Sequence, residues 1–231
     1  MTTLIIVEHN NQKVRATTLA VLAAATQIEG TISALVMGYN CQPVVDELKQ
    51  YGQIDTIHVA NHACYEHQLA ENTAQLVQSV ANDYTHIFAP STTFGKNLLP
   101  RVAALMDIGQ LSDVIAIIDA KTYKRPIYAG NAIATVESSD AIQLATIRPS
   151  AFDRVSPKDG DITITNLETT FDNKHTQFVS ETKQVGDRPE LASADVIISG
   201  GRGLGDKATF DRLIAIADKM GAAVGASRAA V

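Results

Sequence analysis

The first 107 residues alternate short apolar runs with longer stretches in which apolar positions recur every three or four residues. The runs predict strands and the longer stretches predict helices. The expected strands are residues 4–7, 31–37, 56–60 and 86–89, and the expected helices are residues 13–26, 43–51, 67–81 and 94–106. Helices of this length between strands favour crossover connections, and therefore a three-layer α/β fold in which helices cover both faces of a mostly parallel sheet. Pro100 should kink or interrupt the last helix.

After residue 110 the chain consists of short β-rich segments separated by turn residues. The expected strands are residues 114–118, 125–128, 132–136, 142–146 and 177–181. The intervening turns, such as Gly130-Asn131, are typical of hairpins rather than crossovers. We therefore expect antiparallel strands at the edge of the sheet.

The last 37 residues carry the pattern of one βαβ crossover. Residues 195–199 predict a strand, residues 200–205 (GGRGLG) a loop, residues 206–220 a helix that Gly221 ends, and residues 222–225 a second strand. The polar residues 186–190 predict a linker, so the expected domains are residues 1–190 and 191–231. A unit of about 37 residues is below the roughly 40 at which a chain usually needs help to fold. We expect a missing remainder of the chain, a partner, or both.

Composition excludes several classes of protein. The apolar fraction is 45% and the charged fraction 19%, as in soluble globular proteins. The net charge is −6 and the basic residues are dispersed, which argues against nucleic-acid binding. No apolar run approaches the roughly 18 residues of a membrane span, and the amino terminus shows no targeting segment. With only two cysteines, a disulfide framework is not expected. We expect a cytoplasmic, bacterial protein that is not embedded in a membrane.

The glycine loop is the strongest chemical signal, although it is not the dinucleotide fingerprint G-x-G-x-x-G, whose third glycine would fall on Asp206. The loop lies just before a predicted helix and contains Arg202. Either its backbone amides bind an anionic ligand, or its glycines only allow a tight turn. Asp206 is the expected N-cap. Ser227 and Arg228 follow the second strand, and carboxyl ends of parallel strands share one edge. Two cations there would suit an anionic cofactor, unless both are ordinary surface arginines.

Charge supports the cofactor alternative. Residues 195–231 hold five Lys or Arg against four Asp, whereas the rest of the chain carries about −7. Such an asymmetry fits a carboxyl-terminal segment that binds an anion.

Three other motifs give weaker evidence of function. Residues 89–96 resemble a phosphate-binding loop, but the glycine five residues before Gly95 and the Ser or Thr at Asn97 are missing, so residues 91–93 are expected to cap a helix. A cluster of metal-type side chains matches no common zinc spacing: His58, His62, Cys64 and His67. No nucleophile elbow is present, and we predict neither catalytic residues nor a metal site.

The chain resembles the alpha subunit of electron-transfer flavoproteins in five stretches that follow the family's order. They are residues 90–105 (PSTTFGKNLLPRVAAL), 127–132 (IYAGNA), 147–152 (IRPSAF), 199–204 (SGGRGL) and 223–231 (AVGASRAAV). The last two stretches are the most specific.

The resemblance implies an electron carrier rather than an enzyme. This would be an alpha/beta heterodimer with one FAD, which accepts electrons from acyl-CoA dehydrogenases and other dehydrogenases, as in fatty-acid beta-oxidation, and passes them to a membrane quinone oxidoreductase. Residues 1–190 would be an adenine-nucleotide-hydrolase-like domain that contacts the beta subunit and holds no nucleotide. Residues 191–231 would begin a Rossmann-like FAD domain.

By the family pattern, Arg202, Ser227 and Arg228 belong to the FAD site, with Arg228 near the flavin ring. The family's later glycine-rich segments do not follow before Val231, so the expected FAD site is incomplete. Two alternatives stay open. One is a nucleotide-binding α/β protein that uses the amino-terminal sheet, although residues 8–12 (EHNNQ) lack glycine and place Glu8 where phosphate would lie. The other is an assembly module that pairs with the beta subunit without a cofactor.

Overall fold

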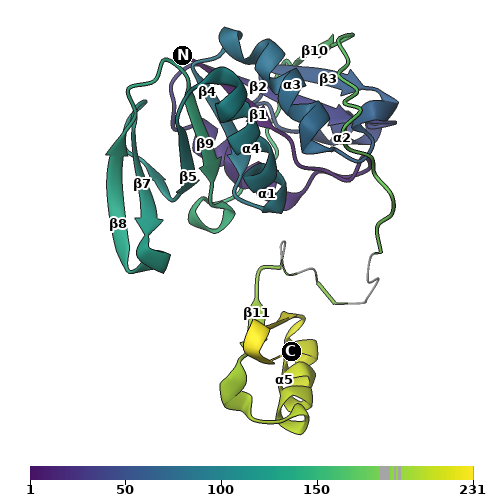
Figure 1. Cartoon of the computed structure of the whole chain (residues 1–231), viewed down its shortest axis with the longest axis vertical. Coiled ribbons are helices and arrows are strands. Elements are labelled where there is room, and N and C mark those ends of the chain that lie inside the picture. Colours follow the sequence, from purple (N-terminus) through teal and green to yellow (C-terminus); the bar gives the residue numbers. More distant parts are fainter. Residues whose placement is uncertain (183–187, 190, 192–193, 231) are drawn as a thin grey trace. The chain divides into compact units, whose positions relative to one another are not determined.

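The computed structural model describes residues 1–182, 188, 189, 191 and 194–230, and the chain forms two compact units (Figure 1). The first unit is Met1–Phe178 and the second is Val179–Val231. The linker expected at residues 186–190 lies, apart from Arg188 and Pro189, outside the described residues. The predicted domain boundary after residue 190 stays a prediction.

A seven-stranded sheet forms the centre of the first unit, with the strand order β10-β3-β2-β1-β4-β9-β5. Its strands are β1 (Thr2–Ile6), β2 (Thr31–Gly38), β3 (Thr56–Asn61), β4 (His86–Pro90), β5 (Gln110–Val114), β9 (Gln143–Ile147) and β10 (Thr163–Asn166). Every pairing between neighbours in this sheet is parallel. The expected α/β fold class is therefore confirmed.

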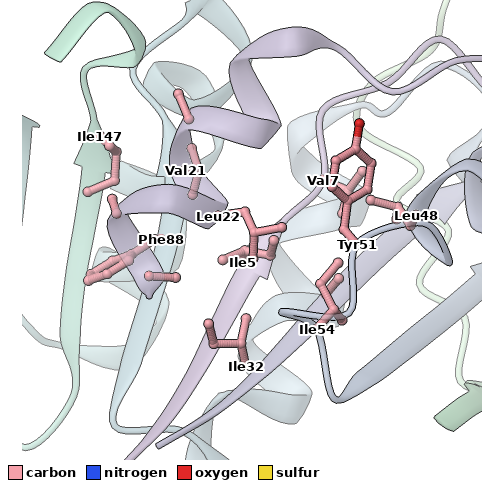
Figure 2. Close-up of a cluster of buried hydrophobic side chains, with 14 of the residues drawn as sticks. Ile5, Val7, Val21, Leu22, Ile32, Leu48, Tyr51, Ile54, Phe88 and Ile147 are labelled. Atoms are coloured by element: carbon pink, nitrogen blue, oxygen red, sulfur yellow. The ribbon is translucent and has the colours of Figure 1, made fainter. Parts of the chain in front are cut away.

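Four helices cover the two faces of this sheet: α1 (Ala16–Ala25), α2 (Gln42–Leu48), α3 (Ala70–Val80) and α4 (Thr93–Met106). Buried side chains of α1 and α2 belong to one apolar cluster, and those of α3 and α4 belong to another. The alternation along β1 explains the division, because Ile5 joins the first cluster whereas Leu4 and Ile6 join the second. Figure 2 shows the first cluster, where Leu22 of α1 lies beside Ile5 of β1.

Helix α4 runs through Pro100 without interruption, so of the two predicted effects, a kink or an interruption, the interruption is wrong. Proline lacks the N–H that would bond the carbonyl of Lys96, four residues earlier. Both Pro100 and Lys96 are exposed, so water can reach that carbonyl. The opposite side of the helix, including Leu98, Leu99 and Val102, is buried and holds α4 against the sheet.

The antiparallel strands are present, but they form a separate sheet instead of the edge of the large one. This sheet contains β6 (Ala116–Ile117), β7 (Thr122–Ile127) and β8 (Ala132–Glu137), paired in that order. The segment expected as a further hairpin strand, residues 142–146, is instead β9, which lies parallel between β4 and β5. All five residues of β9 are buried, as a central parallel strand requires.

Two more expectations need correction. Residues 177–181 form no strand, and Val179 is 89% exposed. Strand β10 was not expected, because its four residues, all exposed, give almost no pattern of burial. Four short 3-10 turns complete the unit: η1 (Ala63–Tyr65), η2 (Ala81–Asp83), η3 (Tyr128–Gly130) and η4 (Pro149–Ala151).

The second unit is the expected βαβ crossover. It consists of β11 (Ile197–Gly200), η5 (Arg202–Leu204), α5 (Lys207–Met220), β12 (Ala223–Ala226) and η6 (Arg228–Ala230), and its two strands are parallel. Its buried apolar side chains are only those of Ala217, Ala222 and Ala223 among the described residues. A core this small gives the unit little stability of its own. In the described part of the chain, no helix has both the length and the apolar character needed to cross a bilayer.

Candidate functional site

The two loops of the second unit meet at one edge of its sheet. Strands β11 and β12 run in register from Ile197 opposite Ala223 to Gly200 opposite Ala226. The ladder continues one step further, because the N–H of Ser227 donates to the carbonyl of Gly200 over 3.0 Å. The turns η5 and η6, which follow these strands, therefore pack against each other.

A larger side chain is disfavoured at Gly200, the last residue of β11, and at Gly205 in the loop. A Cβ on Gly200 would lie 2.4 Å from Leu204 Cδ1 and 2.8 Å from Phe210 Cε2, so the absence of a side chain lets the loop fold back over the strand end. Gly205 has a φ of +80°, a backbone conformation that residues with a Cβ rarely adopt. Gly203, by contrast, faces open space.

Asp206 caps α5, as expected. Its side chain accepts a hydrogen bond from the N–H of Thr209 over 2.7 Å, and this bond lowers the pKa of the carboxyl. The negative charge also lies at the positive end of the helix dipole. The cap fixes where the helix begins, and thereby fixes the path of the loop that precedes it.

A hollow of about 420 Å³ opens between the loop, the first turns of α5 and the turn after β12. It is lined by Gly201, Arg202, Leu204, Gly205, Asp206, Lys207, Phe210 and Ala229. Phe210 and Leu204 supply apolar walls, whereas Arg202 and Lys207 supply positive charge. Lys207 shares its charge with Asp211, at 2.7 Å, one helical turn away.

The three predicted site residues lie at this edge, but only Arg202 lines the hollow. Ser227 lies beside Gly201, on which a Cβ would come 3.6 Å from Ser227 Oγ. Arg228 begins η6 and is exposed. Neither Arg202 nor Arg228 forms an ion pair with another residue in the described part of the chain. Their roles toward FAD stay predictions.

Sequence reasoning missed the hollow's other walls. The sequence pattern predicts Lys207 and Phe210 only as part of the helix, because helical periodicity does not show which residues of the first turn face a neighbouring loop. Ala229 gave no chemical signal at all.

The residues present fit an anionic cofactor with an apolar portion. Within the described residues neither guanidinium forms an ion pair, so each is left to water or an external anion, and glycine residues allow an anion to approach the backbone amides closely. The hollow adds apolar surface from Phe210 beside these charges. FAD combines a pyrophosphate with large aromatic rings, which matches this combination.

The equivalent edge of the first unit is arranged differently. Glu8 follows β1, and its Oε2 accepts hydrogen bonds from Thr17 Oγ1 at 2.8 Å and Thr92 Oγ1 at 3.0 Å. Thr92 is the N-cap of α4, so residues 91–93 lie at the start of the helix as predicted, but its side chain accepts no hydrogen bond from a helix amide. A carboxylate bound by two hydroxyls at this edge disfavours a phosphate there.

The cluster of metal-type side chains is dispersed in the folded chain. Tyr84 Oη lies 2.7 Å from His58 Nε2, His62 Nδ1 lies 3.1 Å from Cys64 Sγ, and His67 stacks on Phe178. Over the part of the chain that the structure describes, no group of three or more His, Cys, Asp or Glu side chains is placed to hold a metal ion.

Comparison with protein families assigns both units. Residues 3–170 match the family model described as "Electron transfer flavoprotein domain". Residues 190–231 match the one described as "Electron transfer flavoprotein FAD-binding domain". The second match covers the loop and hollow described above.

Curated proteins are similar over the whole chain. It is 46% identical to the electron transfer flavoprotein subunit alpha of Pseudomonas aeruginosa, and 44% identical to that of Paracoccus denitrificans; it spans 75% of each. It is 39% identical to the mitochondrial subunit alpha of Dictyostelium discoideum, of which it spans 69%. Together with the two family models, these similarities show that the chain belongs to the alpha-subunit family of electron transfer flavoproteins.

Proposed function

We propose that this chain is the alpha subunit of a heterodimeric electron transfer flavoprotein and that its second unit takes part in binding one FAD. The observation that carries the proposal is the loop edge itself, where Arg202 and the Ser227-Arg228 pair follow two parallel strands joined by the bond between Ser227 and Gly200. The match of residues 190–231 to an FAD-binding domain supports the same site.

Within this proposal the residues of the edge have separate tasks. Arg202 offers its guanidinium to an anionic part of FAD. The glycine residues of the loop have no side chains, so the cofactor can come close to the backbone amides. Ser227 supplies a hydroxyl that can donate or accept a hydrogen bond. Arg228 stabilises negative charge on the flavin, which tunes the reduction potential. When bound, FAD accepts and releases the electrons; the side chains position it and set its electrostatic surroundings.

The proposed partners follow from the role of a carrier. The beta subunit completes the heterodimer, acyl-CoA and other dehydrogenases donate electrons, and a membrane quinone oxidoreductase receives them. This places the protein in fatty-acid beta-oxidation and, in a bacterium, in the cytoplasm. We propose no substrate-transforming active site, because the role of such a subunit is to carry electrons.

Reconstitution tests the cofactor assignment. The chain is purified together with a beta-type partner, mixed with FAD and freed of unbound cofactor, and its visible spectrum is recorded. Flavin absorption in the complex is expected. Arg202→Ala should weaken FAD retention, whereas Arg212→Ala, which removes an exposed arginine from α5, should not. A colourless complex, or equal retention by both variants, would overturn the proposed role of the loop.

The same preparation tests the nucleotide-binding alternative. Glu8 and its two hydroxyl donors disfavour phosphate at the edge of the large sheet. We therefore expect no saturable ATP binding in calorimetric titration of the chain. Tight ATP binding without flavin absorption would favour the alternative function.

A further inference from the structure

The order of the strands divides the large sheet of the first unit at one point. Strand β1 lies between β2 and β4; on one side the sheet continues through β2 and β3, and on the other side it continues from β4 through β9 and β5. Parallel sheets bind their ligands where the strand order reverses in this way, outside the carboxyl ends of the two central strands. In this unit, that point lies between the residues that follow β1 and those that follow β4.

The side chain of Glu8 occupies this point. The backbone of Glu8 is fixed by the start of α1, because its N–H donates to Thr18 Oγ1 over 3.0 Å and its carbonyl accepts from the N–H of Arg15 over 2.9 Å. Its Oε2 accepts hydrogen bonds from Thr17 Oγ1 at 2.8 Å and from Thr92 Oγ1 at 3.0 Å. Thr17 belongs to α1, and Thr92 is the N-cap of α4. One carboxylate oxygen therefore joins two helices that cover opposite faces of the sheet.

The N-termini of both helices favour a negative group at this point. The N-cap of α4, Thr92, uses its hydroxyl to donate to Glu8, and the N-cap of α1, Arg15, has a side chain without any acceptor. Neither helix, both of them described throughout, has an acidic residue in its first turn. The first amides of a helix and its dipole attract negative charge. The carboxylate of Glu8 supplies this charge from outside the two helices.

We infer that Glu8 is an internal ligand of the first unit. Its carboxylate fills the oxyanion position of the crevice between β1 and β4, and it joins α1 to α4 there as a bound carboxylate or phosphate would. In the wild type the crevice is therefore closed to free anions, and loss of the Glu8 side chain opens a site for a small oxyanion. This role concerns the first unit alone and does not depend on FAD binding by the second.

Chemical rescue of Glu8→Ala in the full chain tests the inference. The substitution removes a CH₂–COO⁻ group, which has the size of acetate. It should lower the urea midpoint measured by far-UV circular dichroism, and sodium acetate should raise that midpoint more than sodium chloride of the same concentration. Binding at one site shifts the unfolding equilibrium by a factor that is about tenfold when acetate is at ten times its dissociation constant. The wild type should show no such shift.

Two further variants control for other effects of acetate. Glu29→Ala removes an exposed carboxylate elsewhere, so it reports both the change in net charge and the general effect of the salt on stability. Glu8→Gln keeps an oxygen acceptor and fills the crevice, so its midpoint should not respond to acetate. Equal acetate shifts in Glu8→Ala and Glu29→Ala would overturn the inference.

A second test leaves Glu8 in place and does not require Glu8→Ala to fold. Thr17→Val and Thr92→Val each remove one of the two hydroxyls that donate to the same oxygen. The second removal leaves that oxygen without either donor, so the midpoint of the double variant should fall by more than the sum of the two single falls. Strictly additive falls would show that Glu8 does not couple α1 to α4, and would overturn its role as an internal ligand.

Discussion

Ser227 donates its backbone N–H to the carbonyl oxygen of Gly200 over 3.0 Å. This bond joins the ends of the two strands of the second unit, and Arg202 and Arg228 lie in the turns that immediately follow them. The two arginines therefore extend from adjacent turns of one edge, whose backbone geometry is set by strand pairing rather than by side-chain contacts. A change at either loop should consequently affect the whole edge.

Replacing Arg228 by alanine should lower the reduction potential of FAD in the complex with a beta subunit. A cation near the flavin favours the reduced, more negative form, so its removal favours the oxidised form. Coulomb's law at about 4 Å sets a ceiling on the order of 0.17 V, and water around an exposed arginine reduces this to some tens of millivolts. Spectroelectrochemical titration measures the shift.

Arg228→Lys distinguishes charge from shape in the same measurement. It keeps the charge but lacks the planar guanidinium, so we expect a smaller shift than with alanine. Arg212→Ala controls for the loss of an exposed charge on α5. If the potential of Arg228→Ala equals that of the wild type, Arg228 does not lie near the flavin.

Thr92→Val should destabilise the first unit by about 1–2 kcal/mol. The variant keeps the shape of the side chain but removes the hydroxyl that donates to Glu8 over 3.0 Å, leaving only Thr17 to satisfy the same carboxylate oxygen. Urea denaturation followed by far-UV circular dichroism measures the loss. Thr93→Val alters an exposed residue one position later and should have little effect; equal losses in both variants would argue against the bond to Glu8.

Acid should destabilise the first unit through His9. Burial lowers the pKa of this histidine to about 4, and its Nδ1 accepts a hydrogen bond from the N–H of Asn11 over 3.0 Å. The unfolded chain binds the proton near pH 6.5, so stability is complete above that pH and is lost as the pH falls from 6.5 toward 4. Between pH 6.5 and pH 4, this difference in pKa should lower the free energy of unfolding by roughly 3 kcal/mol.

Urea midpoints at pH 7.5 and pH 5 test this dependence. His9→Gln cannot titrate, so its midpoint should fall less between the two pH values than that of the wild type. His175→Gln changes an exposed histidine and should follow the wild type. His58 and His86 also have pKa values lowered by burial, so part of the acid sensitivity should persist in His9→Gln. Identical pH dependence in wild type and His9→Gln would exclude His9 as a cause.

The sequence predicts most of this fold because its strongest signals are local. The stripe of α1 is an example: Thr17, Thr18, Val21 and Leu22 recur at helical spacing, and all are buried. In the second unit, Asp206 and Gly221 mark the start and the end of α5. Period and capping chemistry act within a few residues, so they can be recognised before any tertiary contact is known.

The misplaced elements are those that depend on distant partners. Strand β9 shows the same short apolar pattern as a hairpin strand, and only its pairing with β4 and β5 makes it a central parallel strand. Thr92 has the residue type of a capping side chain, yet its hydroxyl bonds Glu8, 84 positions earlier. The hollow likewise depends on Ala229 meeting the loop at Arg202. Such relationships arise from packing, which no local pattern records.

Gly95→Ala should destabilise the first unit strongly. Gly95 lies in the first turn of α4, where a Cβ would come 2.0 Å from the carbonyl oxygen of Pro90. Because the obstacle is backbone, α4 would have to move away from the end of β4, and Leu98 and Leu99 would lose packing in the core. We expect a loss of roughly 3 kcal/mol, as for severe overpacking.

Gly203→Ala is the matched control, because no heavy atom lies within 4 Å of the Cβ that it would add. It should change the stability by less than about 0.5 kcal/mol. Urea midpoints by far-UV circular dichroism compare the two variants. We therefore expect a large loss of stability only for Gly95→Ala, because the added Cβ would lie where the backbones of α4 and β4 meet. If Gly95→Ala has the midpoint of the wild type, α4 does not pack against β4 as closely as the structure shows.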